Sequence, residues 1–183
     1  MKRLFIDTET TGLSPRFNRT LTVGMVLADV EKDFLNILEE GHVFIKTKPR
    51  NLNPEAMKIH GIDLVEHNKV AMDPQEACLE VNRFVDDNDL GQTPLVGHNI
   101  SFDRGFLNAL FDSQEKLCKL HSEHEDTMHM WNKLKRREVV PSTLRSTLMS
   151  VSDFFDIDYT KAHDALADCH ITARVYREIL KLS

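Results

Sequence analysis

The spacing of apolar positions indicates strands in the first quarter of the chain. Residues 4–6 are continuously apolar, as in a strand that is covered on both faces. A second strand is predicted over 21–28, and a third over about 36–46, after a turn near 31–33. These segments predict a meander of three consecutive strands at the start of the fold.

The rest of the chain changes to helical spacing, interrupted by short strands. A helix is expected after Asp73, because Ala77, Val81, Phe84 and Val85 recur at the spacing of one helical face. A meander followed by alternating helices and strands favours an α/β fold with a mixed sheet. The other predicted elements are a helix over 54–59 capped by Asn53, a strand over 94–97, a helix from about 101, a weakly signalled strand over 125–128, and helices over 143–155 and 163–182.

Length and composition indicate an ordinary globular protein. The 183 residues are predicted to form a single domain, 1–183, because no repeat or linker-like segment divides them. No apolar run approaches the ~20 residues that span a bilayer, and Asp7 interrupts the N-terminus too early for a signal peptide. We therefore expect a cytoplasmic protein with no membrane contact. Reduced thiols are expected for the three cysteines, which form no CxxC pair: Cys78, Cys118 and Cys169.

The net charge of −6 argues against a surface that grips long duplexes through basic residues. Two local basic clusters nevertheless exist. Each cluster alone is interpreted as a solvated face. If a metal site is present, one of them is expected to line the path of a phosphate backbone. The first contains Lys46, Lys48 and Arg50, and the second contains Lys133, Lys135, Arg136 and Arg137.

Four acids carry the chemical argument. Asp7 and Glu9 project to the same side of the first strand, since side chains alternate along a strand. Asp103 and Asp168 each lie on the apolar stripe of a predicted helix. Buried carboxylates that converge repel one another until a cation arrives, so the pattern predicts a divalent metal site. Oxygen ligands suit Mg²⁺ or Mn²⁺, and such metals support phosphoryl transfer.

Some of these residues, taken singly, also have simpler explanations. Either helical acid alone could cap a helix terminus, but this explanation weakens for two acids together with the Asp7/Glu9 pair. His121, His124 and His129 could suggest zinc, yet their polar surroundings without cysteine favour an exposed linker or helix face.

Four segments resemble the motifs of the DEDDh exonucleases, the family that includes the proofreading subunit of bacterial replicative DNA polymerase. The matching segments are 5–13, 98–103 and 163–168, and more weakly 53–62. They fit in order and spacing from residue 4 to about 180. The resemblance implies a ribonuclease H-like fold with a five-stranded mixed sheet flanked by helices.

The resemblance also implies roles for individual residues. Asp7, Glu9, Asp103 and Asp168 would bind two Mg²⁺ or Mn²⁺ ions, and His163 would be the general base. Contacts with the terminal nucleotide are implied for Asp7, Glu9, Glu55 and His60. Packing against the last bases is implied for Phe102 and Leu13, and core packing is an equal alternative for each of these two.

The implied activity is hydrolysis of terminal phosphodiesters of single strands from the 3′ end, releasing nucleoside 5′-monophosphates. DNA is expected as the preferred substrate over RNA. The chain ends soon after its last predicted helix, which favours a free-standing enzyme of repair or turnover over a constitutive polymerase subunit. Transient polymerase or repair partners and a homodimer are left open.

Two functions of other classes are alternatives. One is a catalytically inactive ribonuclease H-like module that binds nucleic acid or protein, although such a module would be expected to lose at least one acid or His163. The other is an aspartyl-phosphate phosphatase, whose Asp-x-Asp start resembles Asp7-Thr8-Glu9. The residue two after the presumed nucleophile is Glu9 rather than Asp, and the segment 163–168 has no role in that mechanism.

Overall fold

A mixed sheet organises the computed structural model, which describes residues 1–48, 50–160 and 162–183. Its strands are β1 (Lys2–Thr10), β2 (Thr20–Val30), β3 (Leu35–Phe44), β4 (Leu95–Gly97) and β5 (His124–Asp126). They lie in the order β3-β2-β1-β4-β5. β2 runs antiparallel to β1 and β3, whereas β4 is parallel to both β1 and β5. The predicted α/β fold with a five-stranded mixed sheet and an initial meander is confirmed.

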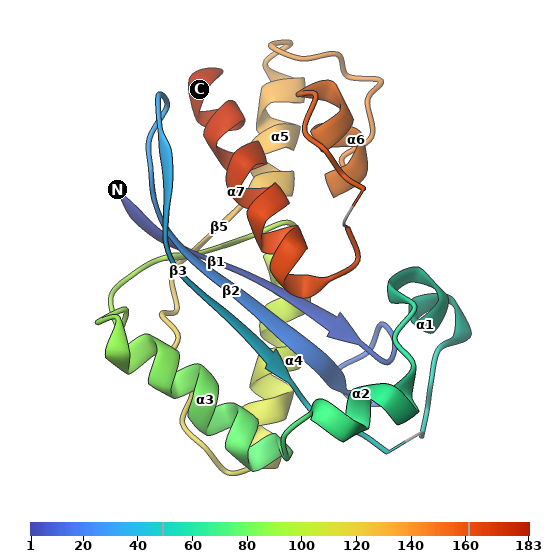
Figure 1. The fold of residues 1–183 in the computed structure, drawn as a ribbon. Coiled ribbons are helices and arrows are strands. Elements are labelled where there is room, and N and C mark those ends of the chain that lie inside the picture. The colour runs from blue at the N-terminus through green and yellow to red at the C-terminus, as the bar shows by residue number, and fades with distance from the viewer. Residues whose placement is uncertain (49, 161) are drawn as a thin grey trace.

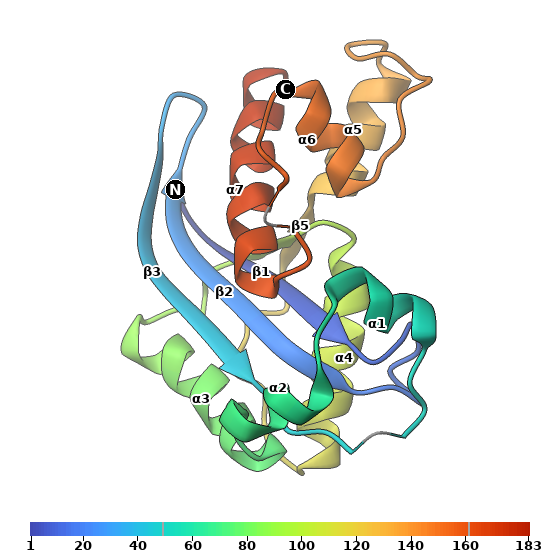
Figure 2. The ribbon, with the colours of Figure 1, turned by 45° about the vertical axis from the view of Figure 1, so that its right-hand side comes forward.

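Helices cover both faces of the sheet. They are α1 (Pro54–His60), α2 (Leu64–Val70), α3 (Pro74–Asp87), α4 (Ile100–Ser113), α5 (Thr127–Arg136), α6 (Leu148–Phe154) and α7 (Ala165–Lys181). α3 and α4 lie against one face, and α7 lies against the other with α5 and α6 beside it (Figures 1 and 2). α1 and α2 lie at the end of the sheet where β1 and β3 finish. No helix in the described part of the chain has the length and apolar character needed to cross a membrane.

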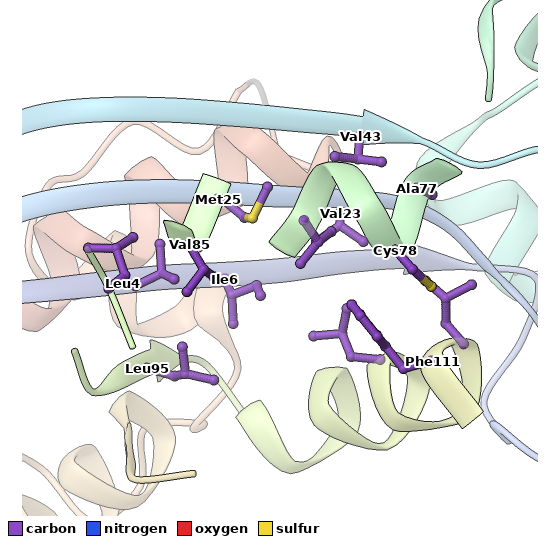
Figure 3. Packing of buried hydrophobic residues seen from close by; sticks show 14 of the residues in the cluster. Leu4, Ile6, Val23, Met25, Val43, Ala77, Cys78, Val85, Leu95 and Phe111 are labelled. Carbon is purple, nitrogen blue, oxygen red and sulfur yellow. The ribbon is translucent and has the colours of Figure 1, made fainter. Parts of the chain in front are cut away.

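Alternate residues of β1 serve two different cores. Leu4 and Ile6 pack with Val23 of β2 between the sheet and the α3/α4 layer, as Figure 3 shows. Phe5 points to the other face, where it meets Tyr176 of α7 edge-on with ring centroids 5.7 Å apart. The prediction that residues 4–6 form a strand covered on both faces is therefore confirmed.

Several predicted boundaries are wrong. The strand expected over 125–128 ends at Asp126, whose carboxylate accepts from the backbone N–H of Met128 and begins α5 there. The helix expected from 143 begins only after Thr147, since the hydroxyl of Thr147 caps it by accepting from Ser150 N–H. Two further helices, α2 and α5, were not predicted from the sequence.

Candidate active site

Three carboxylates meet where β1 ends beside the start of α7. Asp7 and Glu9 project from the same side of β1, and Asp168 lies in the first turn of α7. One oxygen from each of these carboxylates lies within 4.8 Å of the others, close enough for all three to hold one cation. Asp168 is only 7% exposed, as its place on the apolar stripe of the helix predicted. Segments 160 residues apart thus form one acidic group.

The close approach of α7 to the sheet depends on Gly24 of β2, which pairs with Asp7 in the sheet. A Cβ atom built on Gly24 would lie 2.3 Å from the carbonyl oxygen of Ala165, at the start of α7. Only a residue without a side chain fits there, because the opposing atoms belong to backbone. Gly24 therefore allows α7 to bring Asp168 down to the Asp7 side of the sheet.

Gly24→Ala is expected to push the start of α7 away from the sheet. We expect the free energy of unfolding to fall by about 1–3 kcal/mol, as for other overpacked interiors. The nuclease activity that the family resemblance implies should fall by about 10–10²-fold, because a small displacement of catalytic groups lowers the rate steeply. Chemical denaturation and a nuclease assay measure both quantities. Gly91→Ala is the control, because its added Cβ meets nothing within 4 Å; equal effects of both substitutions would contradict the argument.

Asp103 approaches the same end of β1 from α4. It is 3% exposed, and its Oδ1 accepts a hydrogen bond of 2.7 Å from the hydroxyl of Thr8. Thr8 alternates with Asp7 and Glu9, so this bond holds Asp103 beside the strand from the α4 side. Asp103 is not part of the group of three whose oxygens lie within 4.8 Å. Its negative charge nevertheless raises the pKa of Asp7.

Burial and neighbouring negative charges raise the pKa values of all four acids. Burial, then the charges of the other three acids, raises the pKa of Asp7 well above its ordinary value. Burial raises the pKa of Glu9 to about 8, with the charge of Asp168 as the next cause. Burial also raises the pKa of Asp103 to about 7, against the opposing effect of the Thr8 hydrogen bond. It raises the pKa of Asp168 to about 6, against the hydrogen bond from the backbone of His163.

No cationic side chain among the described residues forms an ion pair with these carboxylates. None of the ion pairs within the described part of the chain involves the four acids. Oδ1 of Asp168 is buried and has no hydrogen-bond partner. A buried acceptor without a partner, in a group made only of carboxylates, fits oxygen-loving divalent cations such as Mg²⁺ or Mn²⁺. The acidic site is a metal-binding site of the kind that the sequence predicted.

Without divalent cations, the free energy of unfolding is expected to fall as the pH rises from about 4 to about 8. The pKa values of Asp168, Asp103 and Glu9 rise on folding to about 6, 7 and 8. The folded protein therefore holds more protons than the unfolded chain in this range, and each group lowers stability by up to about 1.4 kcal/mol per pH unit. Urea denaturation in EDTA measures the slope. Saturating Mg²⁺ should flatten it, and a slope of the opposite sign in EDTA would contradict the acidic cluster.

His163 lies beside Asp168 at the edge of the acidic group. It is exposed, it precedes α7 rather than belonging to it, and its φ of 72° is left-handed. The helix predicted from residue 163 begins instead at Ala165, because Asp164 is its N-cap and accepts from Ala167 N–H. The backbone N–H of His163 donates to Oδ2 of Asp168 at 3.2 Å, which fixes the histidine beside that carboxylate. The ring of Tyr159 meets the imidazole edge-on, with centroids 5.9 Å apart.

His98 and Asn99, in the segment 98–103, and Asp126 of β5 have a structural role that was not predicted from the sequence. The Nε2–H of His98 donates to Ser146 O, so Nδ1 is the atom that faces the hydroxyl of Thr127 at 2.9 Å. Asp126 is 6% exposed and accepts from the backbone N–H of Asn99, which begins α4 in a left-handed conformation. These bonds fasten the start of α4, and with it Asp103, to β5 and α5. Asp126 is a buried acid that directly precedes an amphipathic helix, and this position is the sequence signal that could have predicted its role.

The predicted nucleotide contacts come from three elements: Glu55 and His60 lie on α1, Leu13 follows β1, and Phe102 lies on α4. Glu55 is exposed in the first turn of α1, and Leu13 is 71% exposed in the loop after β1. His60 uses Nε2–H to donate to Thr10 O and Nδ1 to accept from Ile62 N–H. Its imidazole nitrogens are thus engaged by backbone, and a nucleotide would meet the face or edge of the ring. Phe102 is half-buried against Phe106, and a nucleotide contact at any of these positions stays a prediction.

The suspected histidine cluster does not form a metal site. The described residues contain one group able to hold a cation by its geometry, and His121, His124 and His129 are not in it. His124 belongs to β5 and His129 to the first turn of α5, where its side chain is 70% exposed. The interpretation of these histidines as polar surface residues fits this placement.

Known proteins share both the sequence pattern and the fold. Ribonuclease T of Shewanella denitrificans is 25% identical over 184 aligned residues, which cover 96% of this chain and 78% of the relative. E. coli exonuclease I in complex with a dT13 oligonucleotide superposes with a TM-score of 0.77 at 20% identity. Exonuclease I of Methylocaldum szegediense gives a TM-score of 0.76 at 22% identity.

The chain matches most of the length of ribonuclease T but less than half of the length of exonuclease I. This chain is covered to 96% and 97% by the two exonuclease I structures but spans only 40% of their length. A family model described as Exonuclease, RNase_T, matches residues 4–176, which include all four acids and His163. The chain therefore belongs to this exonuclease family, the DEDD 3′–5′ exonucleases of the ribonuclease H-like superfamily, as its motifs predicted.

Proposed function

We propose that residues 1–183 act as a single exonuclease domain that removes nucleoside 5′-monophosphates from the 3′ ends of single strands, with DNA preferred over RNA. The observation that carries the proposal is the acidic group of Asp7, Glu9 and Asp168 with the exposed His163 tied to its edge. The exposed side chain of His163 is within reach of a flexible chain end. An acidic group of this kind supports phosphoryl transfer rather than simple structural binding.

Asp7, Glu9 and Asp168 would hold one Mg²⁺ or Mn²⁺ ion, and Asp103 would complete the set for a second. Two such ions would supply Lewis-acid stabilisation of the charge on the attacking and leaving oxygens of an in-line displacement. The protein's own contribution is positioning: the Thr8 hydroxyl orients Asp103, and Gly24 lets α7 present Asp168. These contacts are made before substrate arrives, so little reorganisation is needed during the reaction.

His163 would be the general base. Its imidazole accepts a proton from a water molecule as the water oxygen forms a bond to the terminal phosphorus. The bond between phosphorus and the 3′ oxygen of the preceding nucleotide breaks, and that oxygen is protonated from solvent. Because the backbone N–H of His163 is bonded to Asp168, the base stays beside the cation site while its exposed ring reaches the water.

The choice of a single-stranded substrate draws on relatives. Crystal structures of E. coli exonuclease I contain dT13 and dA16 oligonucleotides, whereas the ribonuclease T relatives are named for RNA. An exonuclease I complex with single-stranded DNA also exists in a zinc-bound form. Substrate sugar and cation are therefore the two variables that an assay must separate. Transient polymerase or repair partners are part of this proposal.

The test is digestion of 5′-labelled single-stranded DNA and RNA in parallel, with Mg²⁺, Mn²⁺, Zn²⁺ or EDTA. We expect a ladder that shortens from the 3′ end with Mg²⁺ or Mn²⁺, faster on DNA, and no products in EDTA. Activity that persists in EDTA, or cuts confined to the middle of the strand, would overturn the mechanism. Faster digestion of RNA would overturn the sugar preference alone. Binding without any cleavage under all four conditions would favour the inactive module.

A further inference from the structure

A basic groove lies beside the loop that follows β1. Two adjoining hollows share Arg19, Lys46, Thr47 and Pro74 in their walls. One of them continues past Phe17, and the other runs along the second half of α4. Arginine and lysine come to this groove from two separate segments, the loop between β1 and β2 and the segment after β3. We call this surface the basic groove; its cationic residues are Arg16, Arg19, Lys46, Lys48 and Arg50.

The positive charge of the basic groove is largely uncompensated. Asp73 is the acid among its lining residues, and Asp73 lies 3.6 Å from the amino group of Lys46. The other four cationic side chains are exposed and have no ion pair within the described part of the chain. Five cations facing one acid stand out in a chain of net charge −6. Such a surface attracts a polyanion rather than a neutral ligand.

An aromatic ring lies within this positive surface. Phe17 is 57% exposed, and the guanidinium of Arg16 lies 5.3 Å from the centroid of its ring. Surfaces that bind single strands without sequence preference combine a cationic groove for the phosphates with aromatic faces on which bases stack. The basic groove offers both features, which favours a nucleic-acid strand over an acidic protein segment.

Backbone hydrogen bonds join the basic groove to the active-site end of β1. Thr11 N–H donates to Arg19 O at 2.9 Å, two residues beyond Glu9 in the sequence. Asn53 N–H donates to Thr11 O at 2.8 Å and is followed directly by α1, the predicted substrate-contacting helix. The side chain of Asn18 donates to Asn51 O at 2.6 Å and holds the two groove segments together. The groove therefore borders the elements that surround the acidic site.

The second basic cluster is less suited to this role. It lies on and after α5, which is at the opposite end of the molecule from α2 in both Figures 1 and 2. Lys135 of this cluster donates to Leu144 O and is half-buried. No aromatic residue lines the hollow beside it. Of the two clusters found in the sequence, the one after β3 is therefore the better candidate to line the path of a phosphate backbone.

We propose that the basic groove binds the sugar–phosphate backbone of single-stranded nucleic acid upstream of the 3′ end that occupies the active site. The inference rests on the proposed function for the identity of the strand. Phosphates contact Arg19, Lys48 and Arg50, and a base stacks on Phe17. Binding at this surface holds a long strand after each terminal nucleotide leaves.

The test compares two triple variants that remove the same charge from exposed positions. Arg19→Gln/Lys48→Gln/Arg50→Gln changes the basic groove, and Lys133→Gln/Arg136→Gln/Arg137→Gln changes the cluster at α5. Fluorescence anisotropy in EDTA gives the Kd for labelled single strands of about 20 and about 4 nucleotides, from about 0.05 to 0.5 M salt. Binding is thus measured without cleavage, and melting curves verify that both variants fold.

For the long strand, the groove variant should bind about 10²-fold more weakly than wild type at about 0.1 M salt, and the slope of log K against log salt should fall by about 2. The loss should shrink for the short strand, which does not reach both sites. The α5 variant should bind like wild type. Equal losses in both variants, or an unchanged slope in the groove variant, overturn the groove. If wild type binds through the groove but produces no 3′ ladder, the groove stands and the proposed function fails.

Discussion

Asp168→Asn should lower the rate of mononucleotide release by about 10³-fold or more and, at pH 8 in EDTA, raise the melting temperature. The two effects share one cause. Oδ1 of Asp168 is buried and unpartnered beside Asp7 and Glu9. This carboxylate can bind a cation, but without a cation its charge destabilises the folded protein. The amide keeps the shape of the side chain and can still accept the backbone hydrogen bond of His163. It removes one negative charge from the group and is a poorer ligand for hard cations.

Nuclease assays with saturating Mg²⁺ and melting curves in EDTA measure these effects. Asp33→Asn is a matched control, because it removes the same charge from an exposed turn between β2 and β3. The control should leave both the rate and the melting temperature close to those of wild type. A lower melting temperature for Asp168→Asn in EDTA would contradict mutual repulsion, and a rate within tenfold of wild type would remove Asp168 from the cation site.

The positions of the acids were predictable because each depends on a local period. Asp7 and Glu9 share a side of β1 by alternation, and helical spacing placed Asp103 and Asp168 on buried stripes. That these four acids meet at one place was inferred from the chemistry of burial and from the family resemblance. Periodicity gave the elements but not their arrangement, since nothing local in a strand records which helix will cover it.

The features that were missed are those that depend on distant partners. Gly24 lies within an apolar strand, and its importance comes only from the carbonyl of Ala165, more than a hundred residues later. Asp126 was included in a weak strand, although its carboxylate begins α5 and holds the backbone of Asn99. The helix after Asp126 carries a usable signal in Trp131 and Leu134, both buried, but its histidine and lysines mask the pattern. Long-range contacts decide such cases.

The last prediction tests whether His163 acts in proton transfer and not in cation binding. His163→Ala should slow nucleotide release by about 10²–10⁴-fold if the imidazole is the general base. The substitution removes the ring but keeps the backbone N–H that donates to Asp168, so the cation site should keep its geometry. We therefore expect the stabilisation of the protein by Mg²⁺ in thermal melts to match that of wild type. Because His163 is exposed, added imidazole can reach the vacated position and should restore part of the rate.

His129→Ala provides the comparison, since His129 is another exposed histidine and lies on α5 rather than beside the acids. Its rate should be that of wild type, with or without added imidazole. An unchanged rate for His163→Ala would mean that another group accepts the proton. It would not contradict the assignment of the acidic site as a cation site. A lost rate together with lost Mg²⁺ stabilisation would mean that the ring supports the cation site itself. Only a lost rate with retained Mg²⁺ stabilisation and rescue by imidazole identifies His163 as the base, because that combination requires a site that still binds cations but lacks a proton acceptor.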